Sequence, residues 1–134
     1  MSDPKVLIVE DDDMNATLLE MILEGEGFRH IDKAYNGVEA LELYKKALRE
    51  VPYRAVFLDI TMPEMDGFEV LRRIRRIEDD ADYSYRSIII MASGDISTDT
   101  VIKTMVEFDA DDHIGKPYDR NEIYESIVRH GIIA

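Results

Sequence analysis

Short runs of consecutive apolar residues recur along the chain and predict its strands. The runs at residues 6–9, 55–58 and 88–92 consist mostly of β-branched or bulky side chains, without polar alternation. This pattern is typical of strands that are buried on both faces, as in a parallel sheet. Weaker runs at residues 31–35 and 113–114 predict two further strands, the first of them short or at a sheet edge.

Between these runs, apolar residues recur at spacings of three and four, which is the period of a helix with one buried face. Strand and helix therefore alternate about five times, and this alternation predicts right-handed βαβ crossovers and a three-layer α/β sandwich. The helical stripes are Met14, Leu18, Met21 and Ile22; Val38, Leu41, Tyr44 and Leu48; Phe68, Leu71, Ile74 and Ile77; Val101, Met105 and Phe108; and Ile123, Ile127 and Val128.

Composition and charge narrow the class of protein. A chain of 134 residues that is 46% apolar suits one domain with a genuine core. Its 29 acidic and 16 basic residues give a net charge of −13, which disfavours direct binding to nucleic acid or to an anionic membrane. The absence of cysteine excludes disulfides, thiolate zinc sites and cysteine nucleophiles. The chain has neither a membrane-spanning run nor a signal-peptide segment, so we expect a cytoplasmic protein.

Polar residues directly follow the predicted strands. Glu10 and Asp11 come after the first strand and Asp59 after the third, whereas Ser93 and Lys116 follow the fourth and fifth. Ligands of an open parallel α/β sheet bind beyond the carboxyl ends of its strands. We therefore expect three acids, a hydroxyl and a lysine to converge at one edge of the sheet.

These residue types suit phosphoryl transfer to a side chain. A carboxylate cluster needs a neutralising positive charge, and oxygen ligands without His or Cys suit a hard cation such as Mg²⁺. Asp59 can act as a nucleophile, because carboxylates form acyl-phosphate intermediates. Lys116 and Ser93 can bind the oxygens of the transferred group. Considered singly, Asp59 also suits the start of a turn and Lys116 an ordinary surface position.

A calcium-binding loop is an alternative explanation of the first acidic cluster. Asp11, Asp13 and Asn15 match the first ligand positions of such a loop. Its sixth position would be Ala16 instead of Gly, and its twelfth Ile22 instead of Glu, so we exclude this alternative.

The sequence resembles the receiver domain of bacterial two-component response regulators, of the single-domain chemotaxis type. The resemblance covers residues 5–128 and implies a (βα)5 flavodoxin-like fold. In that fold a doubly wound, five-stranded parallel sheet of order 2-1-3-4-5, the order known for this family, carries helices on both faces. We expect one receiver domain over residues 1–134, without an output domain in this chain. The matching stretches are residues 5–11, residues 58–67 and Gly115-Lys116-Pro117.

The resemblance assigns a phosphoacceptor and a metal site. Asp59 matches the residue that receives the phosphoryl group. Glu10 and Asp11 match the acidic pair that binds Mg²⁺ together with Asp59 and the backbone carbonyl of Thr61. Asp11 is expected to bind the ion directly and Glu10 through water, and Mn²⁺ can substitute.

The resemblance also assigns residues that contact the phosphate or respond to it. Lys116 matches the lysine that pairs with the phosphate, and its bond to Pro117 is expected to be cis. The family places a switch hydroxyl at the end of the fourth strand. Any of residues 91–93 fits that place, but Ser93 is the only hydroxyl among them. His113 stands where the family usually has the Tyr or Phe ring of the switch, and a histidine would add pH sensitivity.

The implied function is a phosphorelay module that catalyses only its own phosphorylation and slow autodephosphorylation. A sensor histidine kinase or a histidine phosphotransfer protein would donate the phosphoryl group. The fourth helix, fifth strand and fifth helix would then present a changed surface to a downstream protein target. A dimer that forms on phosphorylation is a further possible outcome. Two alternatives compete: a pseudo-receiver that binds partners without phosphorylation, and an aspartyl-nucleophile phosphatase. The phosphatase would need an acid at the position of Thr61.

Overall fold

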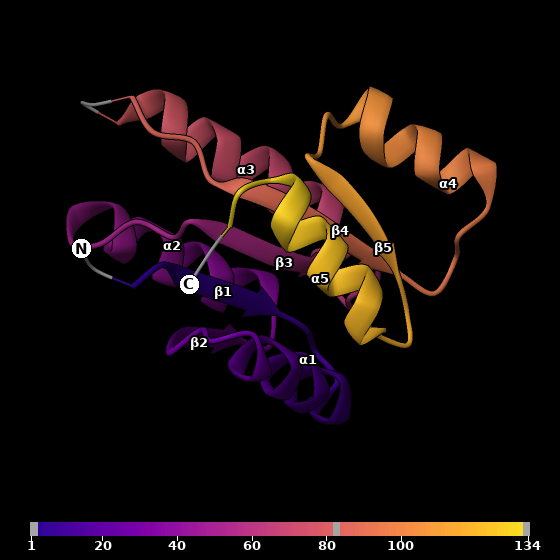
Figure 1. The fold of residues 1–134 in the computed structure, drawn as a ribbon. Coiled ribbons are helices and arrows are strands. Elements are labelled where there is room, and N and C mark those ends of the chain that lie inside the picture. Colours follow the sequence, from indigo (N-terminus) through magenta and orange to yellow (C-terminus); the bar gives the residue numbers. More distant parts are fainter. Residues whose placement is uncertain (1–2, 82–83, 133–134) are drawn as a thin grey trace.

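A computed structural model describes residues 3–81 and 84–132, in which strands and helices alternate along the chain (Figure 1). None of the helices in these two ranges is long and apolar enough to cross a membrane. The elements are β1 (Lys5–Val9), α1 (Asp13–Gly25), β2 (His30–Ala34), α2 (Gly37–Arg49), β3 (Ala55–Asp59), α3 (Gly67–Asp80), β4 (Ile88–Ser93), α4 (Thr98–Ile102), η1 (Lys103–Glu107), β5 (Asp112–Gly115) and α5 (Arg120–Arg129).

The five strands form one parallel sheet in the order β2-β1-β3-β4-β5, which confirms the predicted fold class. β1, β3 and β4 occupy the centre of the sheet, and this position explains their uninterrupted apolar runs. In β1, Val6 and Ile8 face one core cluster while Leu7 and Val9 face the other. The edge strand β2 is only half-buried and carries polar residues.

Helices cover both faces of the sheet (Figure 1). α1 and α5 pack on one face through a cluster that includes Leu19 and Ile123. α2 and α3 pack on the other face through a cluster that includes Tyr44 and Leu71. This arrangement leaves the carboxyl ends of the strands as one edge from which loops lead to the helices.

The stripe expected to be buried on the first helix is largely wrong. Met14, Leu18 and Met21 are 81%, 38% and 62% exposed. Apolar residues lie on more than one side of this helix, so spacing alone does not decide which side meets the sheet. The structure buries the side that has a small residue for close approach, and its buried residues are Ala16, Leu19, Ile22 and Leu23.

The fourth helix changes its winding after one turn. α4 continues into the π-helical turn η1, where the backbone N–H of Phe108 donates to the carbonyl of Lys103 at 3.0 Å. Thr104 is the buried residue of this turn, and its hydroxyl donates to the carbonyl of Thr100 at 2.8 Å. Phe108, which follows this turn, stacks on Phe68 of α3 at a centroid distance of 4.3 Å, so the end of the turn contacts α3.

Candidate functional site

The carboxyl ends of the adjacent strands β1 and β3 bring three carboxylates together. Glu10 and Asp11 follow β1, and Asp59 is the last residue of β3. One oxygen from each of the three lies within 4.8 Å of the others. Glu10 is fully buried and Asp59 is 2% exposed, whereas Asp11 is exposed. The cluster is therefore open to solvent on the side of Asp11.

Lys116 supplies a positive charge to this cluster from the loop after β5. Its Nζ lies 2.9 Å from Oε1 of Glu10 and 3.2 Å from Oδ2 of Asp59. The Lys116–Pro117 peptide bond is cis. Tyr118 follows in the same loop, and its hydroxyl donates to Oε1 of Glu10 at 3.2 Å. One lysine thus faces two buried carboxylates, and negative charge remains in excess.

This excess changes the proton affinity of the two buried acids. Burial and the neighbouring Glu10 carboxylate together raise the pKa of Asp59 to about 8, although Lys116 partly offsets their effect. Burial also favours the neutral form of Glu10, but hydrogen bonding with Asp59 and Lys116 holds its pKa below the usual range. Without another cation, the pair therefore retains a proton near neutral pH. The pKa of Lys116 is raised, because its two carboxylate partners outweigh its burial.

The residues present fit a hard divalent cation. All three side chains offer oxygen ligands, which Mg²⁺ prefers. Oε2 of Glu10 is buried and has no hydrogen-bond partner among the described residues. A buried acceptor without a partner is costly unless a ligand satisfies it. Thr61, whose backbone carbonyl is the fourth expected ligand, lies two residues after Asp59, and its N–H donates to Oδ1 of Asp59 at 3.2 Å.

Ser93 is placed at the same edge of the sheet. It is the last residue of β4 and only 4% exposed, and the β3–β4 register puts Asp59 opposite its neighbour Ala92. Its Oγ accepts a hydrogen bond from the N–H of Asp95 at 2.9 Å. Its carbonyl accepts from the N–H of Lys116 at the same distance, 2.9 Å. The loop after β4 is thereby joined to the loop after β5.

The structure does not bring His113 into the carboxylate cluster. This residue lies in β5 opposite Met91 of β4, half-buried. Its Nε2 is buried and has no hydrogen-bond partner in the part of the chain that the structure describes. Burial lowers the pKa of its ring, although the charges of Glu122, Asp112 and Asp95 oppose this effect.

Two residues that our sequence reasoning did not single out also shape the site. Tyr118 is one, through its bond to Glu10. The other is Gly67, at the start of α3: a Cβ built there would lie 2.3 Å from the carbonyl oxygen of Asp59. The sequence offered one indication of each residue. Gly67 ends one of the matched stretches, and Tyr118 lies two residues after Lys116.

Known protein families and individual proteins that resemble this chain are receiver domains or contain regions similar to it. The family model described as the response regulator receiver domain matches residues 6–128. The chain is 32% identical over 130 residues to Sporulation initiation phosphotransferase F of Bacillus subtilis, covering 97% of this chain and 95% of that protein. It is 33% identical to Chemotaxis protein CheY of Bacillus subtilis, covering 92% of this chain and 93% of that protein.

Other relatives are longer than this chain. Over 129 residues it is 37% identical to Hybrid signal transduction histidine kinase L of Dictyostelium discoideum, covering 95% of this chain but 7% of that protein. It spans half of the uncharacterized transcriptional regulatory protein YkoG of Bacillus subtilis, at 34% identity over 95% of this chain.

Solved structures of receiver domains have the same fold as this chain. One is the CheX-CheY-BeF3-Mg complex of Borrelia burgdorferi, with a TM-score of 0.80 and 32% identity over 94% of this chain and 87% of that one. Another is the Mg²⁺-complexed receiver domain of an Arabidopsis thaliana histidine kinase, with a TM-score of 0.79 and 28% identity over 91% of this chain and 90% of that one. The chain belongs to the response regulator receiver domain family.

Proposed function

We propose that this receiver domain accepts a phosphoryl group from a phosphohistidine onto Asp59, within a two-component or phosphorelay system. The observation that carries this proposal is the cluster of Glu10, Asp11 and Asp59 around Lys116. In it, a nearly buried carboxylate is held between a lysine and two other acids, at the edge where parallel α/β sheets bind ligands. The phosphohistidine donor would be a sensor histidine kinase or a histidine phosphotransfer protein.

The two carboxylate oxygens of Asp59 have different partners, and this difference suits transfer of a phosphoryl group to Asp59. Oδ1 accepts from the N–H of Thr61, and Oδ2 pairs with Nζ of Lys116. In the reaction, an oxygen of the ionised Asp59 attacks phosphorus while the bond from phosphorus to the histidine nitrogen breaks, and the nitrogen keeps the electron pair. Lys116 is then placed to pair with a phosphoryl oxygen. Water later hydrolyses the acyl phosphate, slowly, at the same site.

The metal requirement follows from the surplus of carboxylates. Glu10, Asp11, Asp59 and the carbonyl of Thr61 would hold Mg²⁺, with Mn²⁺ as a substitute. When bound, the ion supplies positive charge beside the phosphoryl oxygens and favours the ionised form of Asp59.

We further propose that phosphorylation changes the surface formed by α4, β5 and α5. A phosphoryl group adds a charge of about −1.5 to −2 at neutral pH. Ser93 lies at the same sheet edge, and its only described side-chain bond is to the N–H of Asp95, at the start of the loop to α4. Exchange of that bond for one to the phosphoryl group would move the loop, and a downstream protein would bind the changed surface.

Phosphorylation by acetyl phosphate with Mg²⁺, followed by intact mass measurement, tests the assignment. We expect one phosphoryl group on the natural chain, none without divalent cation, and none on Asp59→Asn. The matched control is Asp12→Asn, which removes an exposed carboxylate that makes no side-chain cap on α1. This control should still be phosphorylated. Label that persists in Asp59→Asn refutes the assignment.

The alternative function is a module that binds partners without phosphorylation. His113 favours this alternative, because it stands where the family usually has the aromatic residue of the switch. Structures with and without beryllofluoride and Mg²⁺ distinguish the two functions. Movement of Ser93 and His113 supports the switch, whereas an unchanged loop after β4 favours the alternative.

A further inference from the structure

A groove between α2 and α3 concentrates positive charge on a chain whose net charge is −13. It encloses about 470 Å³, and its charged lining consists of four basic and two acidic side chains. The basic residues are Lys45 of α2 and three arginines of α3, and both acids also come from α3. The charged lining residues are Lys45, Arg72, Arg73, Arg76, Glu69 and Asp80.

The basic side chains that line this groove outnumber its acidic ones by two. Glu69 is shared by two arginines, with distances of 3.2 Å to Arg72 and 2.8 Å to Arg73. Both arginine side chains remain more than half exposed, at 61% and 54%. Lys45 and Arg76 are exposed, and neither has a carboxylate within ion-pair distance in residues 3–81 and 84–132, although the charge of Arg76 also acts on Glu69. Two or more cationic groups are therefore available to a ligand.

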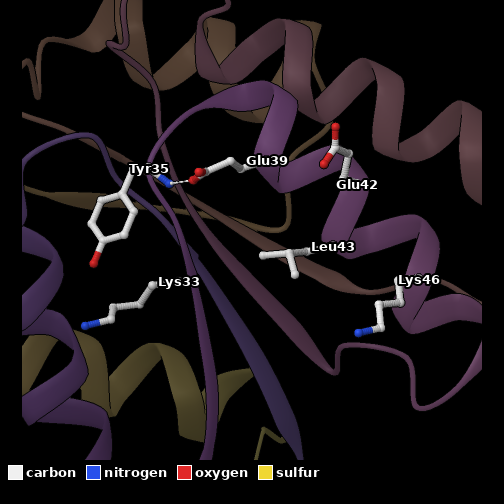
Figure 2. A pocket seen from close by; sticks show the side chains of 6 residues that line it. All are labelled: Lys33, Tyr35, Glu39, Glu42, Leu43 and Lys46. Carbon is white, nitrogen blue, oxygen red and sulfur yellow. Dashed lines mark hydrogen bonds between the residues drawn. The ribbon is translucent and has the colours of Figure 1, made fainter.

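A second groove, on the other side of α2, has a balanced charge and serves as a comparison. It encloses about 400 Å³ and is lined by two lysines and two glutamates, together with Tyr35 and Leu43 (Figure 2). Two of its four charged side chains have partners: Lys33 pairs with Glu20 at 2.9 Å, and Glu39 accepts from the N–H of Tyr35 at 2.7 Å. The two grooves are similar in size, but only the α2–α3 groove carries an excess of positive charge.

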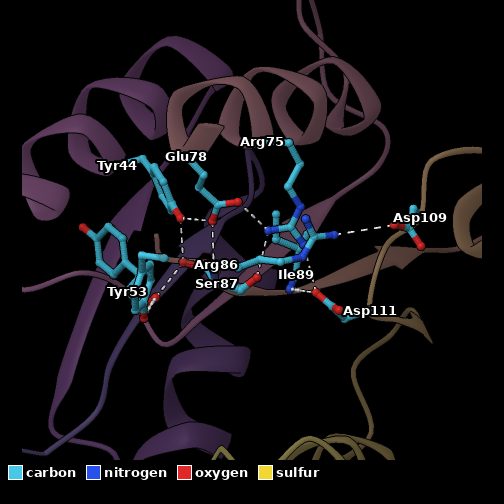
Figure 3. Close-up of polar contacts among 10 residues, drawn as sticks. Tyr44, Tyr53, Arg75, Glu78, Arg86, Ser87, Ile89, Asp109 and Asp111 are labelled. Atoms are coloured by element: carbon cyan, nitrogen blue, oxygen red, sulfur yellow. Dashed lines mark hydrogen bonds and ion pairs between the residues drawn. The ribbon is translucent and has the colours of Figure 1, made fainter. Parts of the chain in front are cut away.

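A buried polar network fixes the two walls of the α2–α3 groove relative to each other (Figure 3). The hydroxyl of Tyr44 in α2 donates to Glu78 in α3, and it is 2.7 Å from the hydroxyl of Ser87. Arg75 pairs with Glu78 at 2.8 Å and with Asp111 at 3.0 Å. The α3 arginines are thus divided, because Arg75 turns inward to this network while the other three line the groove. A groove with fixed walls pays less ordering entropy when it binds a ligand.

We propose that the α2–α3 groove binds a short acidic segment of a partner protein that also presents an apolar side chain. The guanidinium groups match carboxylates with paired hydrogen bonds. Between the charges, the half-buried Leu41 and Ile77 offer an apolar surface to such a side chain. A nucleic acid or an anionic membrane would contact much more of the molecule than this groove, and the net charge of −13 on the whole chain disfavours both. The proposal does not depend on phosphorylation of Asp59.

Fluorescence anisotropy with a labelled synthetic peptide, in which glutamates and aspartates flank one leucine, tests this proposal. We expect salt-dependent binding to the natural chain and to Asp59→Asn alike. The double variant Arg73→Glu/Arg76→Glu should weaken binding at least about tenfold, through lost attraction and new repulsion. The matched control, Lys46→Glu/Arg49→Glu, makes the same change in net charge on the exposed surface of α2 and should bind like the natural chain.

Several results would overturn the proposal. Absence of binding, or equal weakening by both double variants, would show that the groove is not the binding site. Equal binding of a peptide with glutamine and asparagine in place of the acids would show that charge does not matter. Equal or tighter binding of a labelled oligonucleotide or of anionic lipid vesicles would show that the ligand is not an acidic protein segment. If the groove variant does not fold, amide chemical shifts of the natural chain keep the test decisive. Shifts confined to α2 and α3 support the proposal, and shifts elsewhere refute it.

Discussion

Replacement of Asp59 by asparagine should stabilise this protein when no divalent cation is bound. The substitution keeps the shape of the side chain and the acceptor that the N–H of Thr61 uses. It removes a carboxyl group that is 2% exposed and lies against the buried Glu10. The energetic cost of ionising that group therefore disappears.

The size of the effect follows from the pKa of Asp59, which rises from 3.8 to about 8 on folding. The folded protein retains a proton that the unfolded chain has lost, so this group reduces stability progressively as pH rises from about 4 to about 8. At about 1.4 kcal/mol per pH unit, the whole interval corresponds to at most ~6 kcal/mol. Asparagine also loses the ion pair with Lys116, so we expect a gain of about 2–4 kcal/mol at pH 8 and only about 1 kcal/mol at pH 5.

Urea unfolding in EDTA at pH 5 and pH 8 measures both values. The control Asp79→Asn removes an exposed carboxylate of α3 and should change stability by less than about 0.5 kcal/mol. Mg²⁺ should stabilise the natural chain by mass action and reduce its difference from Asp59→Asn. The reasoning is refuted if Asp59→Asn is no more stable than the natural chain at pH 8, or if its advantage is equal at both pH values.

Two further substitutions test close packing and buried hydrogen bonding. Gly67→Ala should destabilise the protein by about 2–4 kcal/mol and impair phosphorylation, because its Cβ would lie 2.3 Å from the backbone carbonyl that ends β3. Gly94→Ala, whose Cβ would meet nothing within 4 Å, is the control in thermal unfolding, and an equal loss in both would contradict the steric argument. Tyr44→Phe should cost about 1–3 kcal/mol, because Glu78 loses a buried donor. Tyr124→Phe, at a 51% exposed side chain, should be nearly neutral in urea unfolding, and similar values for the two tyrosines would refute a role of the buried bond.

Local patterns in the sequence were sufficient for the strands and for the composition of the candidate site. β1, β3 and β4 were predictable because a strand buried on both faces needs apolar residues at every position. The convergence of Glu10, Asp11, Asp59 and Lys116 followed from one geometric rule, since carboxyl ends of neighbouring parallel strands meet at one sheet edge. The roles proposed for these residues remain predictions.

Only the tertiary structure decided which apolar stripe of α1 is buried and where the fourth helix changes its winding. Both features depend on how a helix packs against the sheet. Apolar residues at spacings of three and four occur on more than one side of α1, so their pattern does not decide which side is buried. The division of the α3 arginines has the same origin: neighbours in sequence point in different directions, and only Arg75 reaches Glu78 and Asp111. The altered pKa of Asp59 also arises from burial beside another acid. The sequence by itself therefore determined which chemical groups are present and at which strand ends they lie, whereas folding decided their burial, their partners and their charge.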